Sequence, residues 1–154
     1  MPDRCVVGAC RRERVVHCDL RGAARQARAD ISAAALGMPV AAIVGVPLRH
    51  GNALYSWGAA MACGDCLGIV PKSYVPNYAE FYEGRWFASG AAVRDASITL
   101  GGRDVPFGTD ITFDIDGARC GVEICEDLWV PVPPSSHTAT AGAEVIFNMS
   151  ASPE

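Results

Sequence analysis

Residues 121–129 read Gly-Val-Glu-Ile-Cys-Glu-Asp-Leu-Trp, and the seven residues that follow are Val-Pro-Val-Pro-Pro-Ser-Ser. The small and β-branched residues from Ala118 to Ile124 predict a buried strand. Two acids directly after Cys125 cannot prolong an apolar run, so we expect the chain to turn just past the cysteine. A thiol at the end of a strand lies at the rim of a sheet, where a ligand can reach it. We therefore interpret Cys125 as a nucleophile.

Two other interpretations of this stretch stay open. A single cysteine in an apolar strand is commonly a structural core residue. A nucleophilic pair of Cys125 with His137 is also conceivable, although His137 falls at the expected start of a helix. The acids that flank the cysteine are Glu123, Glu126 and Asp127, and we expect them to solvate the rim or to accept backbone hydrogen bonds.

The composition indicates one globular domain over residues 1–154, because half of the residues are apolar and 19% are charged. A net charge of −4 and scattered arginines provide no basic face for nucleic acid. No apolar run is long enough to span a bilayer, so we expect a cytoplasmic protein without a membrane partner. Seven cysteines, an odd number, favour reduced thiols over a disulfide framework.

The lysine content of the chain is unusually low. Among thirteen basic residues the only lysine is Lys72, which directly follows an apolar run ending at Pro71. An ammonium is a compact point charge and proton donor, which a guanidinium replaces poorly. The pattern therefore marks Lys72 as a candidate site residue, with a chance surface lysine as the alternative.

The remaining pattern predicts an α/β domain. Residues 1–18 have no clear period and stay unassigned. Residues 71–78 form a proline-punctuated, aromatic-rich loop, which we expect outside the core and near a site. We predict a surface helix over 19–37, strands over 40–46, 54–62, 67–70, 98–100, 105–107, 111–115 and 145–149, and a short helix that Ser135 or Ser136 caps and that runs through Ala143.

Two details of this pattern concern possible sites. The strands that end near Cys125 and Met149 enclose the short helix, so we expect them to be parallel neighbours with the site at their carboxyl ends. Cys63-Gly64-Asp65-Cys66 separates two strands, which predicts a hairpin that turns on Gly64 and Asp65. Its Cys-x-x-Cys spacing also suits a zinc knuckle or redox pair, for which the conceivable partners are Cys5, Cys10, His17 and Cys18; we expect incidental thiols and no metal.

The segments 68–87 (GIVPKSYVPNYAEFYEGRWF) and 122–136 (VEICEDLWVPVPPSS) resemble the glutaminase domain of glutamine-dependent NAD synthetases, in the nitrilase (carbon–nitrogen hydrolase) superfamily. Segments 44–50, 104–110 and 148–153 resemble it too, so the match runs from about Pro39 to the end. The resemblance implies a partial nitrilase-like α-β-β-α sandwich. It also implies self-association, glutamine as substrate and a synthetase domain as partner.

The resemblance further implies roles for individual residues. Cys125 would attack the γ-carboxamide of glutamine and form a thioester, Lys72 would stabilise the oxyanion with the backbone N–H after Cys125, and Glu83 would orient Lys72. Tyr78, Trp129 and Ser152 match positions of the glutamine pocket. No cofactor is implied for this domain; ATP and Mg²⁺ would serve the synthetase domain.

The sequence departs from the family at two places. The family's general base is a Glu in a Phe-Pro-Glu-Leu context that does not occur here, and Asp3, near that position, is one methylene shorter. The chain also stops before the rest of the glutaminase domain and the synthetase domain. We therefore expect an incomplete domain, with a nitrilase-type amidase for another substrate, or a catalytically silent structural module, as the alternative functions.

Overall fold

The computed structural model describes residues 30, 33–34, 40–79 and 81–150. The expected helix over 19–37 lies mostly outside these residues; the described positions 30, 33 and 34 are helical. Residues 1–18, with Asp3 and the conceivable metal partners, and Ser152 also lie outside them. Within the described residues no helix is long and apolar enough to cross a membrane.

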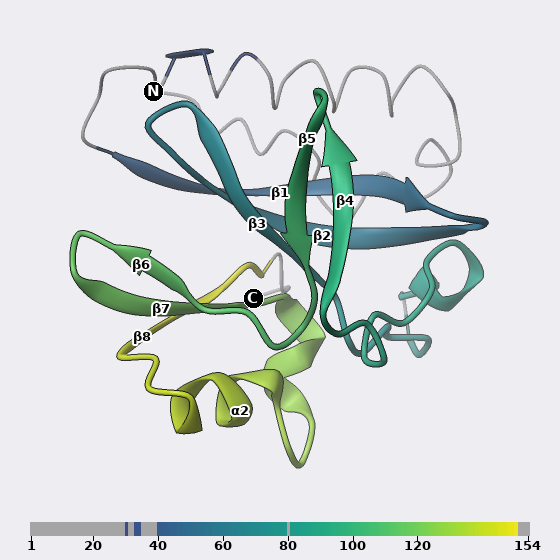
Figure 1. Cartoon of the computed structure of the whole chain (residues 1–154). Helices are drawn as coiled ribbons and strands as arrows, with labels where there is room; N and C mark the ends of the chain where they lie inside the picture. Colours follow the sequence, from purple (N-terminus) through teal and green to yellow (C-terminus); the bar gives the residue numbers. More distant parts are fainter. Residues whose placement is uncertain (1–29, 31–32, 35–39, 80, 151–154) are drawn as a thin grey trace.

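The larger sheet has five strands in the order β1-β2-β3-β5-β4 (Figure 1). Antiparallel pairs join β1 to β2, β2 to β3 and β4 to β5, whereas β3 and β5 pair in parallel at Ile69 and Phe107. The predicted strands of this sheet are confirmed, several of them with longer bounds. They are β1 (Ala41–His50), β2 (Ala53–Ala62), β3 (Asp65–Pro71), β4 (Ala96–Leu100) and β5 (Arg103–Phe107).

The hairpin between β2 and β3 forms as predicted, but its turn is one residue earlier. Cys63 and Gly64 have φ values of 51° and 86°, and Asp65 already begins β3. Positive φ at both central residues is the two-residue turn that matches strand twist. The prediction placed Gly64 at the first turn position, whereas Cys63 occupies it in the left-handed conformation.

The smaller sheet has three strands in the order β6-β7-β8, which are β6 (Phe113–Ile115), β7 (Ala118–Glu123) and β8 (Val145–Asn148). β7 and β8 are parallel, as predicted. The helix between them, α2 (Pro134–Thr140), has Pro133 as N-cap without a side-chain cap. The expected capping by Ser135 or Ser136 is therefore wrong, because the helix starts with Pro134 at its first position and its N-cap is Pro133, two residues before Ser135.

The two sheets pack face to face. Alternate residues of β2 and β3 point to opposite faces, so Ala59 and Ile69 belong to the core on the outer face of the larger sheet. Ala60 and Val70 instead meet the smaller sheet. Phe113 and Val122 complete that inner core. Figure 1 shows α2 on the side of the smaller sheet away from β1 and β2, which fits the partial α/β sandwich that the family resemblance implied.

One glycine marks how closely the sheets approach. A Cβ at Gly68 would lie 2.8 Å from Cε1 of Phe113. Because real Cβ atoms do not approach other atoms so closely, this position of β3 requires glycine. The close packing fixes the end of β3 relative to the smaller sheet, and the candidate site residues lie at these strand ends.

Candidate active site

Cys125 lies at a sharp bend at the carboxyl end of β7. Ile124 is extended, Cys125 has a φ of 49°, and the chain continues in the 3₁₀ helix η3 (Cys125–Trp129). A non-glycine residue in the left-handed region costs roughly 1–3 kcal/mol, and such residues cluster at functional sites. The bend leaves the thiol half-buried and without a hydrogen bond among the described residues. The predicted turn after the strand is confirmed.

The backbone around Cys125 provides hydrogen-bond donors. The first N–H groups of a helix have no partner inside the helix, and Glu126 is in the first turn of η3. Asn148, at the end of β8, donates its Nδ2 to the carbonyl oxygen of Cys125 at 3.4 Å. The cysteine therefore lies where two parallel strands end, as expected from the strand-helix-strand pattern.

Lys72 directly follows β3 and forms a buried ion pair with Glu83. Its Nζ lies 2.6 Å from Oε2 of Glu83, and the two residues are 2% and 8% exposed. The backbone of Lys72 is fixed as well, because its N–H donates to Ser56 and its carbonyl accepts from Gly90, both at 2.8 Å. The expectation that residues 71–78 lie outside the core is wrong for Pro71, Lys72, Ser73 and Pro76, which are buried; the loop is exposed at Tyr74, Asn77 and Tyr78.

A short 3₁₀ helix, η2 (Glu83–Arg85), positions the carboxylate of this pair. The carbonyl of Glu83 accepts the N–H groups of Trp86 and Phe87, both at 2.9 Å. The main chain of Glu83 is thus fixed independently of its side chain. The structure brings Lys72 and Glu83 together as the resemblance implied.

Asp127 connects the Lys72 segment to the Cys125 segment. Its Oδ1 accepts the backbone N–H groups of Ser73 at 3.0 Å and Tyr74 at 2.7 Å, and its Oδ2 accepts that of Ile124 at 3.1 Å. Hydrogen bonds to a charged group contribute about 1.5–3 kcal/mol each. These bonds join segments that lie more than fifty residues apart in sequence.

Asp127 is also electrostatically coupled to Lys72. Burial raises the pKa of Asp127 from 3.8 to about 6, against the lowering effects of the hydrogen bonds from Tyr74, Ile124 and Ser73 and of the Lys72 charge. The carboxylate is 1% exposed. The expectation of backbone hydrogen bonds is therefore confirmed for Asp127, while solvation of the rim is wrong for it.

Glu123 is a second buried carboxylate beside Cys125. Its Oε2 accepts the N–H of Ser135 at 3.1 Å and its Oε1 accepts Nδ2 of Asn148 at 3.2 Å. It thereby joins β7 to the first turn of α2 and to β8. Like Asp127, it accepts a backbone hydrogen bond as expected and is removed from water.

The described residues of the predicted glutamine pocket, Tyr78 and Trp129, are exposed to solvent. Tyr78 is 56% exposed and Trp129 is 69% exposed. The Tyr78 hydroxyl donates to Oε2 of Glu126, the neighbour of Cys125, at 2.7 Å. Tyr78 and Trp129 thus belong to segments that meet around the cysteine.

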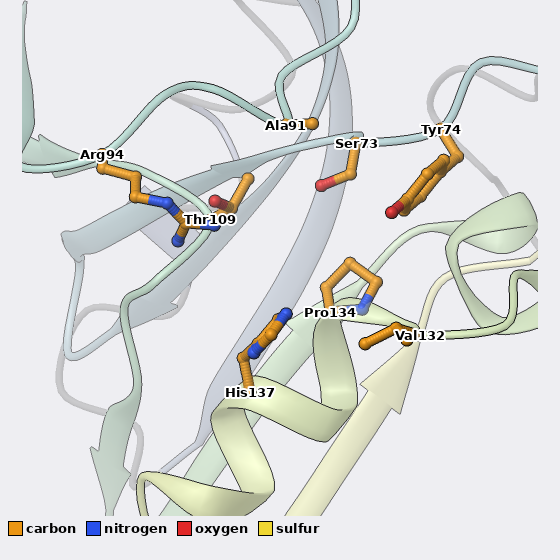
Figure 2. Close-up of a pocket in the computed structure, with 8 residues that line it drawn as sticks. All are labelled: Ser73, Tyr74, Ala91, Arg94, Thr109, Val132, Pro134 and His137. Atoms are coloured by element: carbon orange, nitrogen blue, oxygen red, sulfur yellow. The ribbon is translucent and has the colours of Figure 1, made fainter.

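A separate hollow lies beside the loop that follows Lys72 (Figure 2). It is small and open, with a cavity volume of about 80 Å³. Its lining residues are Ser73, Tyr74, Ala91, Arg94, Thr109, Val132, Pro134 and His137. None of the predicted catalytic residues is among them. His137 faces this hollow, and no hydrogen bond joins it to Cys125 in the described part of the chain.

The described residues contain no group of three or more His, Cys, Asp or Glu that could hold a metal ion. The Cys63 thiol is exposed in the β2–β3 turn, and the Cys66 thiol is partly buried. The suggested histidine and cysteine partners of a zinc site precede the described residues.

The fold is that of the carbon–nitrogen hydrolases. A carbon-nitrogen hydrolase from Helicobacter pylori G27 superimposes with a TM-score of 0.66 over 86% of this chain and 40% of its own, at 22% identity. No family model matches the sequence. The structural match therefore defines the fold class, which is a partial nitrilase-like sandwich.

The sequence is similar to one kind of enzyme in particular. The glutamine-dependent NAD(+) synthetase of Mycobacterium tuberculosis (strain H37Rv) is 50% identical over 114 residues, which make up 72% of this chain and 17% of that protein. A glutamine-dependent NAD(+) synthetase from Cytophaga hutchinsonii superimposes with a TM-score of 0.78 and 25% identity, over 98% of this chain and 24% of its own. The chain is therefore homologous to a segment of the glutamine-dependent NAD(+) synthetases, and it spans about a fifth of their length.

Proposed function

We propose that this chain carries the amide-hydrolysing site of a glutamine-dependent NAD synthetase, with Cys125 as nucleophile, Lys72 as oxyanion donor and Glu83 as the group that orients Lys72. The observation that carries the proposal is the buried Lys72–Glu83 ion pair, joined through Asp127 to the bend at Cys125. The names of the similar proteins support glutamine as the amide and NAD synthesis as the use of its nitrogen.

The proposed reaction has two stages. The Cys125 sulfur attacks the γ-carboxamide carbon, a carbon–sulfur bond forms, and the carbon–nitrogen bond breaks as the thiol proton leaves with the nitrogen as ammonia. Water then hydrolyses the γ-glutamyl thioester to glutamate and restores the thiol. The oxygen that becomes negative in each stage would be stabilised by Lys72 and by the N–H of Glu126, and one such donor contributes about 2.7–4 kcal/mol.

The remaining assignments complete the proposal. Tyr78, Trp129 and Ser152 would line the glutamine pocket. The ammonia would pass to a synthetase part of the longer enzyme, which would use ATP and Mg²⁺, whereas the glutaminase chemistry needs no cofactor in this chain.

The test is labelling with a chloroketone analogue of glutamine, located by peptide mass spectrometry. Labelling requires the nucleophile and the oxyanion donors, so it tests the site whichever residue supplies the general base. Cys63 is an internal control, because it is exposed whereas Cys125 is only half-buried. We expect Cys125 to be labelled before Cys63, and free glutamine to protect Cys125 alone.

Two results would count against the proposal. If the more exposed Cys63 is labelled before Cys125, and glutamine protects neither, the chain would be a catalytically silent structural module. Protection of Cys125 by another carboxamide but not by glutamine would indicate a nitrilase-type amidase with a different substrate.

A further inference from the structure

We infer that Asp127 is a positioning residue, which sets the Lys72 ammonium relative to the Cys125 thiol by holding the backbones of both segments. The inference rests on the proposed function, because positioning matters only if Lys72 and Cys125 act on the same substrate. Its structural basis is the set of hydrogen bonds that the Asp127 side chain accepts. It concerns a residue outside the proposed trio of Cys125, Lys72 and Glu83.

The geometry of Asp127 suits this role because its carboxylate accepts backbone N–H groups from segments that follow strands of both sheets, with the Ser73 N–H also 3.4 Å from Oδ2. Oδ1 accepts the N–H groups of Ser73 and Tyr74, which follow β3 of the larger sheet, and Oδ2 accepts that of Ile124, which directly follows β7 of the smaller sheet. Asp127 is itself anchored in η3, where its N–H donates to the Ile124 carbonyl at 3.1 Å.

The backbone amides that Asp127 binds include those of the residues adjacent in sequence to Lys72 and Cys125. Ser73 follows Lys72 directly, and Ile124 precedes Cys125 directly. Loss of the carboxylate would release the Lys72 side of the site from the Cys125 side while the Lys72–Glu83 pair stayed intact. A group that stabilises an oxyanion must be correctly placed, and a displacement of about 1 Å can cost roughly 100-fold in rate.

Glu123 is also a buried acid close to Cys125 in sequence, but its hydrogen bonds do not connect the Cys125 segment to the Lys72 segment. Its bonds go to Ser135 and Asn148, in the α2 and β8 segments that adjoin β7. It therefore stabilises the smaller sheet and its helix, and within the described residues its side chain makes no hydrogen bond to the Lys72 segment.

The experiment compares Asp127→Ala and Asp127→Asn with the wild-type chain. The control is Asp114→Ala, since Asp114 also accepts a backbone N–H, from Gly117 at 3.0 Å, but in the exposed β6–β7 turn. Each protein reacts with the glutamine chloroketone over a range of concentrations, which separates the maximal inactivation rate from the half-saturating concentration. Each also reacts with iodoacetamide, which alkylates Cys125 without forming an oxyanion.

For Asp127→Ala we expect the maximal chloroketone rate at Cys125 to fall about 100-fold, with the half-saturating concentration and the iodoacetamide rate little changed. Asp127→Asn keeps one carbonyl oxygen for Ser73 and Tyr74 but loses the acceptor for Ile124, so its rate should be intermediate. Asp114→Ala should match wild type. A wild-type rate in Asp127→Ala, or a parallel loss of both reagents' rates, would overturn the inference.

Amide hydrogen exchange separates this inference from the proposed function. We expect the N–H groups of Ser73, Tyr74 and Ile124 to exchange faster in Asp127→Ala, and chiefly that of Ile124 in Asp127→Asn, while the Gly108 N–H, which donates to the Ile69 carbonyl at 3.1 Å, stays protected. Unchanged protection of the three amides would contradict the role of Asp127 even if the wild-type chain is labelled. Failure to label the wild-type chain, with faster exchange in the variants, would refute the proposed chemistry alone.

Discussion

The two halves of the candidate site differ in their access to water. The buried half consists of Lys72, Glu83 and Asp127, and the most exposed of these, Glu83, is only 8% exposed. The open half consists of Cys125, Tyr78 and Trp129, of which the last is 69% exposed. Charges fixed away from water act strongly on a reacting group, whereas the sulfur must meet its ligand from solvent. Substitutions in the buried half should therefore cost stability as well as chemistry, and those in the open half should affect chemistry and binding.

The largest effect is expected from Lys72→Met. It leaves the Glu83 carboxylate buried without its partner, which costs about 3–5 kcal/mol of the free energy of unfolding. Urea unfolding measures this loss. The double variant Lys72→Met/Glu83→Gln removes both charges and should recover most of the stability, as a double-mutant cycle would show. A single variant as stable as wild type would contradict the buried pair.

A pH-dependent effect is expected from Asp127. Its pKa of about 6 in the folded protein exceeds that of the unfolded chain, about 3.9. Its contribution to stability is therefore complete below about pH 4 and declines by about 3 kcal/mol as pH rises through 6, because the unfolded state ionises first. The difference in unfolding free energy between wild type and Asp127→Asn isolates this group from other carboxylates. A difference that is flat between these pH values would show that the carboxylate is not desolvated.

A smaller effect is expected at Cys125, where the left-handed backbone favours glycine. Cys125→Gly should be more stable than Cys125→Ala by about 1 kcal/mol, the excess of relieved strain over the backbone entropy of glycine. Thermal unfolding of the two variants, neither of which has the thiol, measures the backbone contribution alone. An alanine variant as stable as the glycine variant would argue against the bend.

The smallest effect on stability is expected in the open half. Tyr78→Phe and Trp129→Ala should change the unfolding free energy by less than about 0.5 kcal/mol, as is usual for surface substitutions. Both should raise the chloroketone concentration needed for half-maximal labelling of Cys125. Tyr82→Phe is the matched control, because Tyr82 is 61% exposed. An equal rise of the half-saturating chloroketone concentration in all three variants would show that Tyr78 and Trp129 do not line the glutamine pocket.

The sequence predicted the parts of this molecule that depend on local pattern. The β2–β3 hairpin, the strand before Cys125 and the parallel strand after α2 each follow from apolar runs bounded by turn residues. The pairing of Lys72 with Glu83 came from the resemblance of the segment 68–87 to the family, since no local pattern links a lysine after a strand to a glutamate eleven residues later.

Two features could not be predicted, for physical reasons. The turn of the β2–β3 hairpin falls on Cys63 and Gly64 because the cross-strand pairing of Ala62 with Asp65 leaves only these two residues between the strands. The contacts of Asp127 depend on the path of a loop more than fifty residues away in sequence. The one available signal was an acid two residues after a turn-forming cysteine, and it fits a solvated side chain equally well.

The most direct test of the account uses the single lysine of the chain. In protein labelled only at lysine with ¹³C and ¹⁵N, the Lys72 side chain gives one set of NMR signals without assignment. We predict that these signals shift when the glutamine chloroketone modifies Cys125, and that they stay in place when the reagent is added to Cys125→Ala. Modification of Cys125 that leaves the Lys72 signals unchanged would contradict a site shared by the thiol and the ammonium.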